Sequence, residues 1–244
     1  MNNAIVIIDF DNYFTKDINE YSKTQIEYLF SLIVRHVYEH NNIKEIQIRL
    51  YGGWYQDDDL TNRASNVIQK ISSIDIFPII RGHNKIDGNI EIVDSLYGIN
   101  YVWHNTYREK KGIPHLRINY LAKDDKCESQ RHLCPVHILS KFTKGKNRIC
   151  INEGCTTKHA EVFFQKEQKM VDTMIACDLL SYSEEVTVDC LYLISDDVDH
   201  FPALALCAKK KEKLSIFLGV KNNKNISLYK SILTQFNINL FSLS

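Results

Sequence analysis

Short apolar runs alternate with segments of helical periodicity at the start of the chain. Residues 4–8 form a β-branched run that predicts a buried strand ending at Asp9. The apolar positions between 24 and 37 recur at helical spacing, and the alternating pattern of 43–51 predicts a second strand. Together these three segments predict a β-α-β unit.

The same alternation continues on both sides of a long interruption. Further helices are expected near 60–71, 169–180, 203–209 and 226–236, and further strands at 74–80, 190–194, 214–220 and 238–242. A chain of this kind is typical of an α/β fold. We therefore expect a mainly parallel sheet with helices on both faces.

The interruption, 83–166, has a different character and is interpreted as an insertion into a core formed by 1–82 and 167–244. It contains two predicted antiparallel strands, 101–107 and 115–122, on either side of a charged segment. A segment bearing cysteines and histidines follows them. The insertion is thus expected to hold a β-hairpin and a metal-binding segment.

Composition limits the reading without deciding it. The 244 residues are 44% hydrophobic, which is enough for a sizeable core, and 30 basic residues balance 30 acidic ones. Overall charge therefore gives no hint of nucleic-acid binding, and any such surface must come from local segregation of charge. Neither a signal-peptide pattern nor an apolar run of spanning length is present, so a cytoplasmic location without membrane contact is expected, and homo-oligomerisation stays open.

Acidic residues follow two of the predicted strands, and one more opens a predicted helix. Because ligand sites in parallel α/β sheets lie at the carboxyl ends of the strands, these groups are expected to converge. Like charges this close favour a divalent cation, and oxygen ligands alone point to Mg²⁺ or Mn²⁺. The residues concerned are Asp9 and Asp11, then Asp172, then Asp196, Asp197 and Asp199.

Asp178 lies on the same predicted helix as Asp172 but at a different angle around its axis. At about 100° per residue it falls on the apolar arc of the helix, so we expect it to be buried. A buried carboxylate must be paired, hydrogen-bonded or protonated. Asp178 is therefore either structural support or an inner ligand.

Three motifs resemble those of the NYN domains in the PIN-like nuclease superfamily, which are similar to bacterial LabA-like proteins. The first, IIDFDNYF, contains Asp9 and Asn12, and the second, KMVD, contains Lys169 and Asp172. The third, SDDVDHFP, contains Ser195, Asp197, Asp199 and Pro202. The match covers two blocks, 1–82 and 167–244. Three residues depart from the family pattern, because Met170 and Asp196 stand where glycine is usual and His200 stands where phenylalanine is usual.

The resemblance implies a Rossmann-like PIN fold and a metal-dependent endoribonuclease that hydrolyses RNA phosphodiester bonds with Mg²⁺ or Mn²⁺. It also implies roles for the residues that match the motifs. Asn12 and Ser195 would position the metal ligands, and Lys169 could meet a phosphate. Asp196 could replace Asp197 if the altered turn shifts the register by one residue. The implied metal ligands are Asp9, Asp172, Asp197 and Asp199.

Four cysteines gather in the insertion and are spaced as two pairs. Four thiolates around Zn²⁺ could close a loop-rich segment that lacks a core of its own, and a histidine could replace one of them. Unligated thiols are the alternative. The cysteines are Cys127, Cys134, Cys150 and Cys155, and the histidines are His132, His137 and His159.

A basic loop lies between the two cysteine pairs. Its residues Lys141, Lys144, Lys146 and Arg148 could contact phosphates as a patch of point charges. An ordinary solvated loop would have the same composition. The partner that the resemblance implies is RNA, single-stranded or structured, with DNA as a further possibility.

Two other functions stay open. DFDNY and SDDVD are similar to motifs of haloacid dehalogenase-like phosphatases, which would use Asp9 as a nucleophile and leave Asp172 without a role. A non-catalytic RNA-binding or adaptor protein could also keep this fold, although the four aspartates argue against it.

Overall fold

The computed structural model describes residues 3–40, 43–81, 83–111, 131–143, 149–150, 152–210, 214–221 and 226–243. Contacts within the chain divide it into two units. The first comprises 1–107 and 168–244, and the second comprises 108–167.

A seven-stranded sheet forms the centre of the first unit, in the order β11-β10-β9-β1-β2-β6-β5. All neighbouring strands are parallel except the edge pair β5 and β6, which is antiparallel. Their bounds are β1 Asn3–Asp9, β2 Glu45–Tyr51, β5 Ile79–Arg81, β6 Asn84–Ile92, β9 Val188–Ile194, β10 Ser215–Val220 and β11 Asn239–Ser242.

Strand β1 lies between β2 and β9, and both of its faces are covered. Ala4, Val6 and Ile8 pack into one hydrophobic cluster. Ile5 and Ile7 pack into the other. A strand that is buried on both faces must be apolar throughout, which explains its uninterrupted β-branched run.

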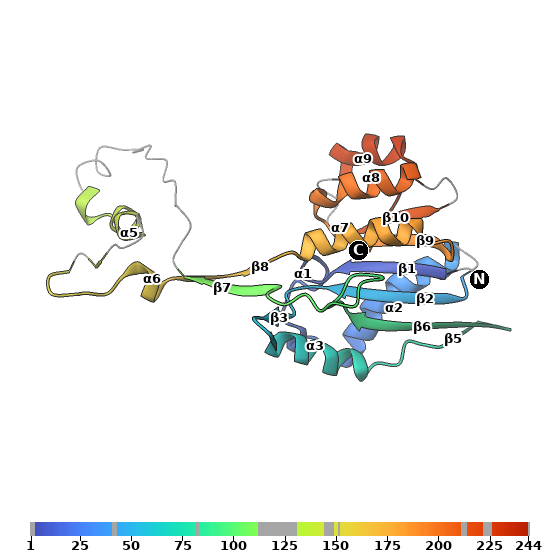
Figure 1. The fold of residues 1–244 in the computed structure, drawn as a ribbon, viewed down its shortest axis with the longest axis horizontal. Helices are drawn as coiled ribbons and strands as arrows, with labels where there is room; N and C mark the ends of the chain where they lie inside the picture. Colours follow the sequence, from blue (N-terminus) through green and yellow to red (C-terminus); the bar gives the residue numbers. More distant parts are fainter. Residues whose placement is uncertain are drawn as a thin grey trace. The chain divides into compact units, whose positions relative to one another are not determined.

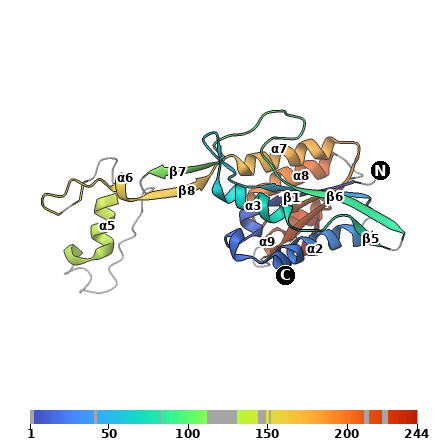
Figure 2. The same cartoon turned by 90° about the horizontal axis from the view of Figure 1, so that it is seen from below.

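Helices cover both faces of the sheet (Figure 1). Helices α2 (Lys23–His40) and α3 (Asn62–Ser72) contribute to the cluster that contains Ala4. Helices α7 (Val171–Glu184), α8 (Phe201–Lys210) and α9 (Ile226–Gln235) contribute to the cluster that contains Ile5. Figure 2 shows α7 and α8 lying side by side. The predicted α/β class, with its mainly parallel sheet, is confirmed.

Five short elements join these strands and helices near the ends of the strands. Two of them, α1 (Phe10–Tyr13) and η3 (Val198–His200), come soon after β1 and β9. The others are η1 (Ile18–Glu20) and the small antiparallel pair of β3 (Tyr55–Gln56) and β4 (Asp59–Leu60).

The second unit begins later than the expected position 83. Residues 84–92 form β6, which pairs with β2 in the core sheet. Gly88 allows this close approach, because a Cβ atom there would lie 2.4 Å from the carbonyl oxygen of Ile46. The polar sequence of β6 hides it from a pattern analysis, since eight of its nine residues are exposed or partly exposed near the sheet edge.

The expected strand at 101–107 is wrong for most of its length, because 101–105 form an irregular segment bound to the core. The Trp103 amide donates to the Asp94 carbonyl at 2.7 Å. The Thr106 hydroxyl accepts from the amides of Trp54 and Tyr55 at 3.0 Å. These contacts hold the segment as a loop.

Strands β7 (Tyr107–Lys111) and β8 (Phe164–Gln168), which lie almost wholly in the second unit, form a two-stranded sheet (Figure 2). The charged residues 108–111, expected as a connection, are part of β7. Three further elements are described: η2 (Arg131–Leu133), α5 (Pro135–Thr143) and α6 (His159–Val162). The second expected strand, 115–122, lies outside the described residues.

Candidate active site

Asp9 is the last residue of β1 and the first residue of the candidate site. It caps α1, and its carboxylate is buried, with 4% of the residue exposed. The side-chain amide of Asn12 donates to Oδ2 of Asp9, and the Asn12 backbone amide lies 3.4 Å from Oδ1. The first motif thus folds back on itself and fixes the orientation of this carboxylate.

Ser195 connects the end of β9 to the end of β1. Its Oγ donates to Oδ2 of Asp9 at 3.1 Å and accepts from the backbone amide of Asp197 at 3.0 Å. The hydroxyl group is buried and therefore uses both its donor and its acceptor capacity within the site. The first and third motifs meet through this one side chain.

Asp172 lies in the first turn of α7, where the helix dipole favours a negative charge. Met170 precedes it in the left-handed region, with φ 63° and ψ −11°. This conformation favours glycine, and glycine is the residue that is usual at this position of the resembled motif. Just before it, the amide of Lys169 donates to the Thr106 carbonyl at 2.9 Å.

The four predicted aspartates are close enough for their charges to interact. Asp172 is exposed, but nearby protein atoms displace part of the water around its carboxyl group. This desolvation raises the pKa of Asp172. The charges of Asp9, Asp197 and Asp199 also raise this pKa, while His200 opposes the shift. The ends of β1 and β9 and the start of α7 therefore bring these residues near one another.

The turn after β9 separates the roles of the neighbouring acidic residues. Asp196 Oδ1 accepts from the amide of Lys221 at 2.9 Å, which ties the end of β9 to the end of β10. Asp197 Oδ1 accepts from the Asp199 amide at 2.9 Å and so caps η3. Asp199 is exposed. These bonds support the unshifted register, with Asp196 as a connecting residue.

His200 is the site residue that sequence reasoning missed. It is 1% exposed, and its Nε2 lies 3.7 Å from Oδ2 of Asp9. One ligand atom each from His200, Asp9 and Asp172 lie within 4.8 Å of one another. The available signal was a polar residue in a motif position that is usually apolar.

The residues present fit a divalent cation. Atoms bound to one ion at about 2.0–2.2 Å lie roughly 3–4 Å apart, so small side-chain adjustments would bring these three groups into coordination. The Nε2 of His200 is buried and has no hydrogen-bond partner in the described part of the chain. A buried polar atom without a partner is costly, and a metal ion would satisfy it.

Asp11 does not belong to the acidic cluster, because Arg63 of α3 binds it through both terminal nitrogens. The guanidinium of Arg63 also lies 5.0 Å from the ring centroid of Phe10 and 5.9 Å from that of Trp54. The charge of Asp11 is therefore balanced within the protein.

Asp178 is fully buried, and both of its carboxylate oxygens accept hydrogen bonds. Its Oδ2 accepts from Tyr51 and, at 3.1 Å, from Arg49, and its Oδ1 accepts from the amide of Tyr97 at 2.9 Å. Burial raises the pKa of the Tyr51 hydroxyl well above its usual range, so Tyr51 stays a donor to this carboxylate. Of the two roles left open, the hydrogen bonds favour support.

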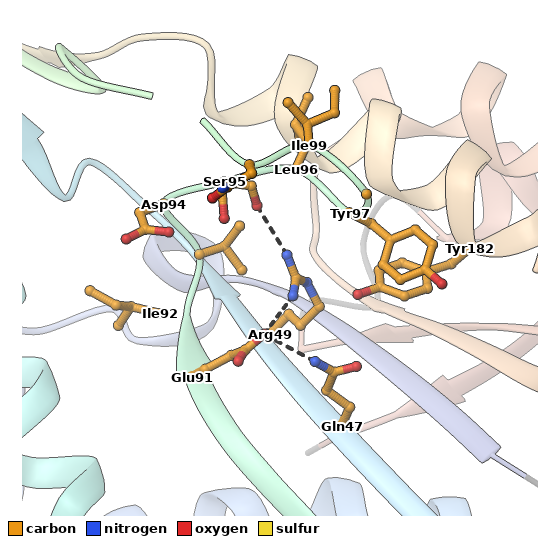
Figure 3. A pocket seen from close by; sticks show the side chains of 13 residues that line it. Gln47, Arg49, Glu91, Ile92, Asp94, Ser95, Leu96, Tyr97, Ile99 and Tyr182 are labelled. Atoms are coloured by element: carbon orange, nitrogen blue, oxygen red, sulfur yellow. Dashed lines mark hydrogen bonds and ion pairs between the residues drawn. The ribbon is translucent and has the colours of Figure 1, made fainter. Parts of the chain in front are cut away.

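A pocket of about 500 Å³ opens beside this network (Figure 3). Arg49 lies at its centre, where it donates to the Ser95 carbonyl at 3.1 Å and pairs with Glu91. Tyr97 and Tyr182 form one wall. The lining includes none of the four predicted aspartates, so the pocket is separate from the acidic cluster.

The predicted zinc site is described only in part. The amide of Cys150 donates to the Thr157 carbonyl at 2.8 Å, and hydrogen bonding with Thr157 and Cys150 lowers the pKa of the Cys155 thiol. Among the residues that the structure describes, no three cysteines and histidines come within 4.8 Å of one another. Cys127 lies outside those residues, so the zinc site stays a prediction.

The remaining members of the second unit add little to this site. Cys134 and His137 are partly buried and His132 is exposed, whereas His159 is buried with an Nδ1 that has no hydrogen-bond partner within the described ranges. The side chain of Lys141 and the whole of Lys144, Lys146 and Arg148 lie outside the described residues.

No helix in the described ranges is both long and apolar enough to cross a bilayer.

The resemblance to a known family rests on the three sequence motifs alone. Comparison with protein-family models, curated proteins and solved structures gave no match.

Proposed function

We propose that the chain is a metal-dependent endoribonuclease with its active site at the carboxyl ends of β1 and β9. One observation carries the proposal: Asp9 and Asp172 approach each other with His200, while Asp197 and Asp199 lie close enough to raise the pKa of Asp172. Carboxylates gathered this closely repel one another unless a cation balances them.

The roles follow from the contacts. Asp9 and Asp172 would hold the cation directly, and Asp197 and Asp199 would add charge on its solvent side. A divalent cation supplies an activated water and stabilises the charge that develops on a phosphodiester. Asn12 and Ser195 bind the same oxygen of Asp9 and so orient the carboxylate, as supporting groups around metal ligands do.

The choice of RNA and of a PIN-like family rests on the three motifs, which occur in the expected order. Cytoplasmic RNA, single-stranded or structured, is the proposed substrate class. Lys169 immediately precedes the turn that leads into α7, and in this proposal its ammonium group meets a phosphate of the bound strand. DNA is the comparison substrate.

The contacts favour a nuclease over a phosphatase of the haloacid dehalogenase type. Such a phosphatase would use Asp9 as its nucleophile, but one oxygen of Asp9 already accepts from Asn12 and Ser195. Asp172 has no role in that mechanism, whereas here it lies beside Asp9. Asp11, the second acidic residue of DFDNY, is bound by Arg63.

The test uses end-labelled RNA, unstructured and hairpin, with matched DNA and with Mg²⁺ or Mn²⁺ present. We expect cleavage of RNA that Asp9→Asn and Asp172→Asn each lower by at least about a hundredfold, because a metal contributes several kcal/mol to such reactions. Asp189→Asn is the matched control, since Asp189 lies near the opposite end of β9. Equal cleavage by all three variants would exclude the proposal.

A further inference from the structure

The position of His200 follows from the turn that carries it. Asp197 caps η3 by accepting from the Asp199 amide, and α8 begins directly after His200. The turn packs against both α7 and α8. The side chain of His200, the last residue of η3, is therefore enclosed by protein. Such surroundings suit the phenylalanine that is usual in the resembled motif, and in this chain they hold an imidazole.

An imidazole enclosed in this way needs a partner for each nitrogen. The Nε2 of His200 has none within hydrogen-bonding distance among the described residues. The nearby Oδ2 of Asp9, at 3.7 Å, is too distant for a hydrogen bond and is already bound by Ser195. A direct ion pair between His200 and Asp9 therefore does not satisfy this nitrogen.

The unpartnered nitrogen faces the two carboxylates that the proposed function assigns to the metal. Ligand atoms of His200, Asp9 and Asp172 lie within 4.8 Å of one another. They come from three separate elements, η3, β1 and α7. A cation between them would give the buried nitrogen a partner and would balance the two negative charges.

We propose that His200 is a direct ligand of the metal and that it makes the site select Mn²⁺ over Mg²⁺. The inference rests on the metal site of the proposed function. It adds a metal ligand at a position where the third motif usually has phenylalanine. Imidazole is a good ligand for transition-metal ions, whereas Mg²⁺ prefers oxygen ligands and keeps its water. A site with two carboxylates and one imidazole thus discriminates in favour of Mn²⁺.

The first measurement is metal binding without any RNA. We expect calorimetric titration of the full chain to give a dissociation constant for Mn²⁺ at least about tenfold lower than that for Mg²⁺. His200→Phe, which restores the usual residue of the motif, should weaken Mn²⁺ binding by at least about tenfold and leave Mg²⁺ binding nearly unchanged. Equal affinities for the two ions in the unmodified protein would overturn the proposal.

The second measurement detects the bond itself. Electron spin-echo envelope modulation of the Mn²⁺-loaded protein should show coupling to a histidine nitrogen. His200→Phe and His200→Gln should abolish the coupling, and His104→Gln should retain it, since His104 lies beside Asp58 outside the cluster. Absence of nitrogen coupling in the unmodified protein, or its survival in the His200 variants, would overturn the proposal even if one variant folds poorly.

The two proposals fail in different ways. Nitrogen coupling in a protein that cuts no RNA would retain His200 as a ligand and exclude the nuclease. Cleavage with Mg²⁺ and no nitrogen coupling with Mn²⁺ would retain the nuclease and exclude His200 from the metal.

Discussion

The Oγ of Ser195 donates a hydrogen bond of 3.1 Å to Oδ2 of Asp9, which joins two residues 186 positions apart. Ser195→Ala removes this bond and the acceptor of the Asp197 amide. We expect RNA cleavage to fall by about 10- to 100-fold, as for other groups that orient metal ligands. Ser181→Ala is the control, because the Ser181 hydroxyl donates to the carbonyl of Cys177 within α7, at 3.0 Å. Unchanged kcat/KM in Ser195→Ala would contradict this role.

Asp196 and Asp197 are adjacent but should respond differently to the same change. Asn at either position keeps a side-chain oxygen, so the bonds to Lys221 and to the Asp199 amide can persist. Only Asp197→Asn removes charge from the proposed metal site. Cleavage should fall by at least about tenfold in Asp197→Asn and stay within about twofold in Asp196→Asn. The reverse result would indicate a register shifted by one residue.

Asp178→Ala should destabilise the protein without affecting metal binding. The substitution leaves Arg49 and Tyr51 facing a buried space without their shared acceptor. Removing one partner of a buried ion pair costs about 3–5 kcal/mol, which urea unfolding can measure. Glu184→Ala, on the same helix, is expected to cost at most about 1 kcal/mol, because its pair with Lys210 is exposed. A loss of Mn²⁺ affinity in a folded Asp178→Ala protein would make Asp178 an inner ligand instead.

The cysteines of the second unit predict a bound metal that is independent of the active site. After extensive dialysis, elemental analysis should find about one zinc per chain. Cys150→Ser or Cys155→Ser should release it, whereas Cys177→Ser, in α7, should not. Zinc-free protein would identify these cysteines as ordinary thiols.

Local patterns predict those parts of the fold where burial dictates the residue type. The strand of 4–8 is apolar because both faces are covered, and the helix from 23 to 40 keeps one apolar side toward the sheet. Strand β6 escapes prediction because it lies one strand from the sheet edge. Only Ile86 among its nine residues is buried. Its place in the sheet depends on pairing with β2, which no local pattern encodes.

The candidate site, like the fold, can be predicted from the sequence only in part. The aspartates follow strands or open a helix, so topology alone brings them together. His200 is different, because its significance comes from the absence of a hydrogen-bond partner for Nε2 and from its distance to Asp9. Both are properties of the folded chain. In the sequence, His200 is only a departure from a motif.

The order of strands in the sheet also determines when the site can form during synthesis of the chain. Strand β1 gains β2 as a neighbour early, but β9 becomes available only after the segment 108–167 has been made. Until then one edge of β1 has no partner, and Asp9 lacks Ser195, Asp172 and His200. If the chain is the nuclease proposed above, a chain still attached to the ribosome at that stage would have no complete active site and could not cut the surrounding RNA.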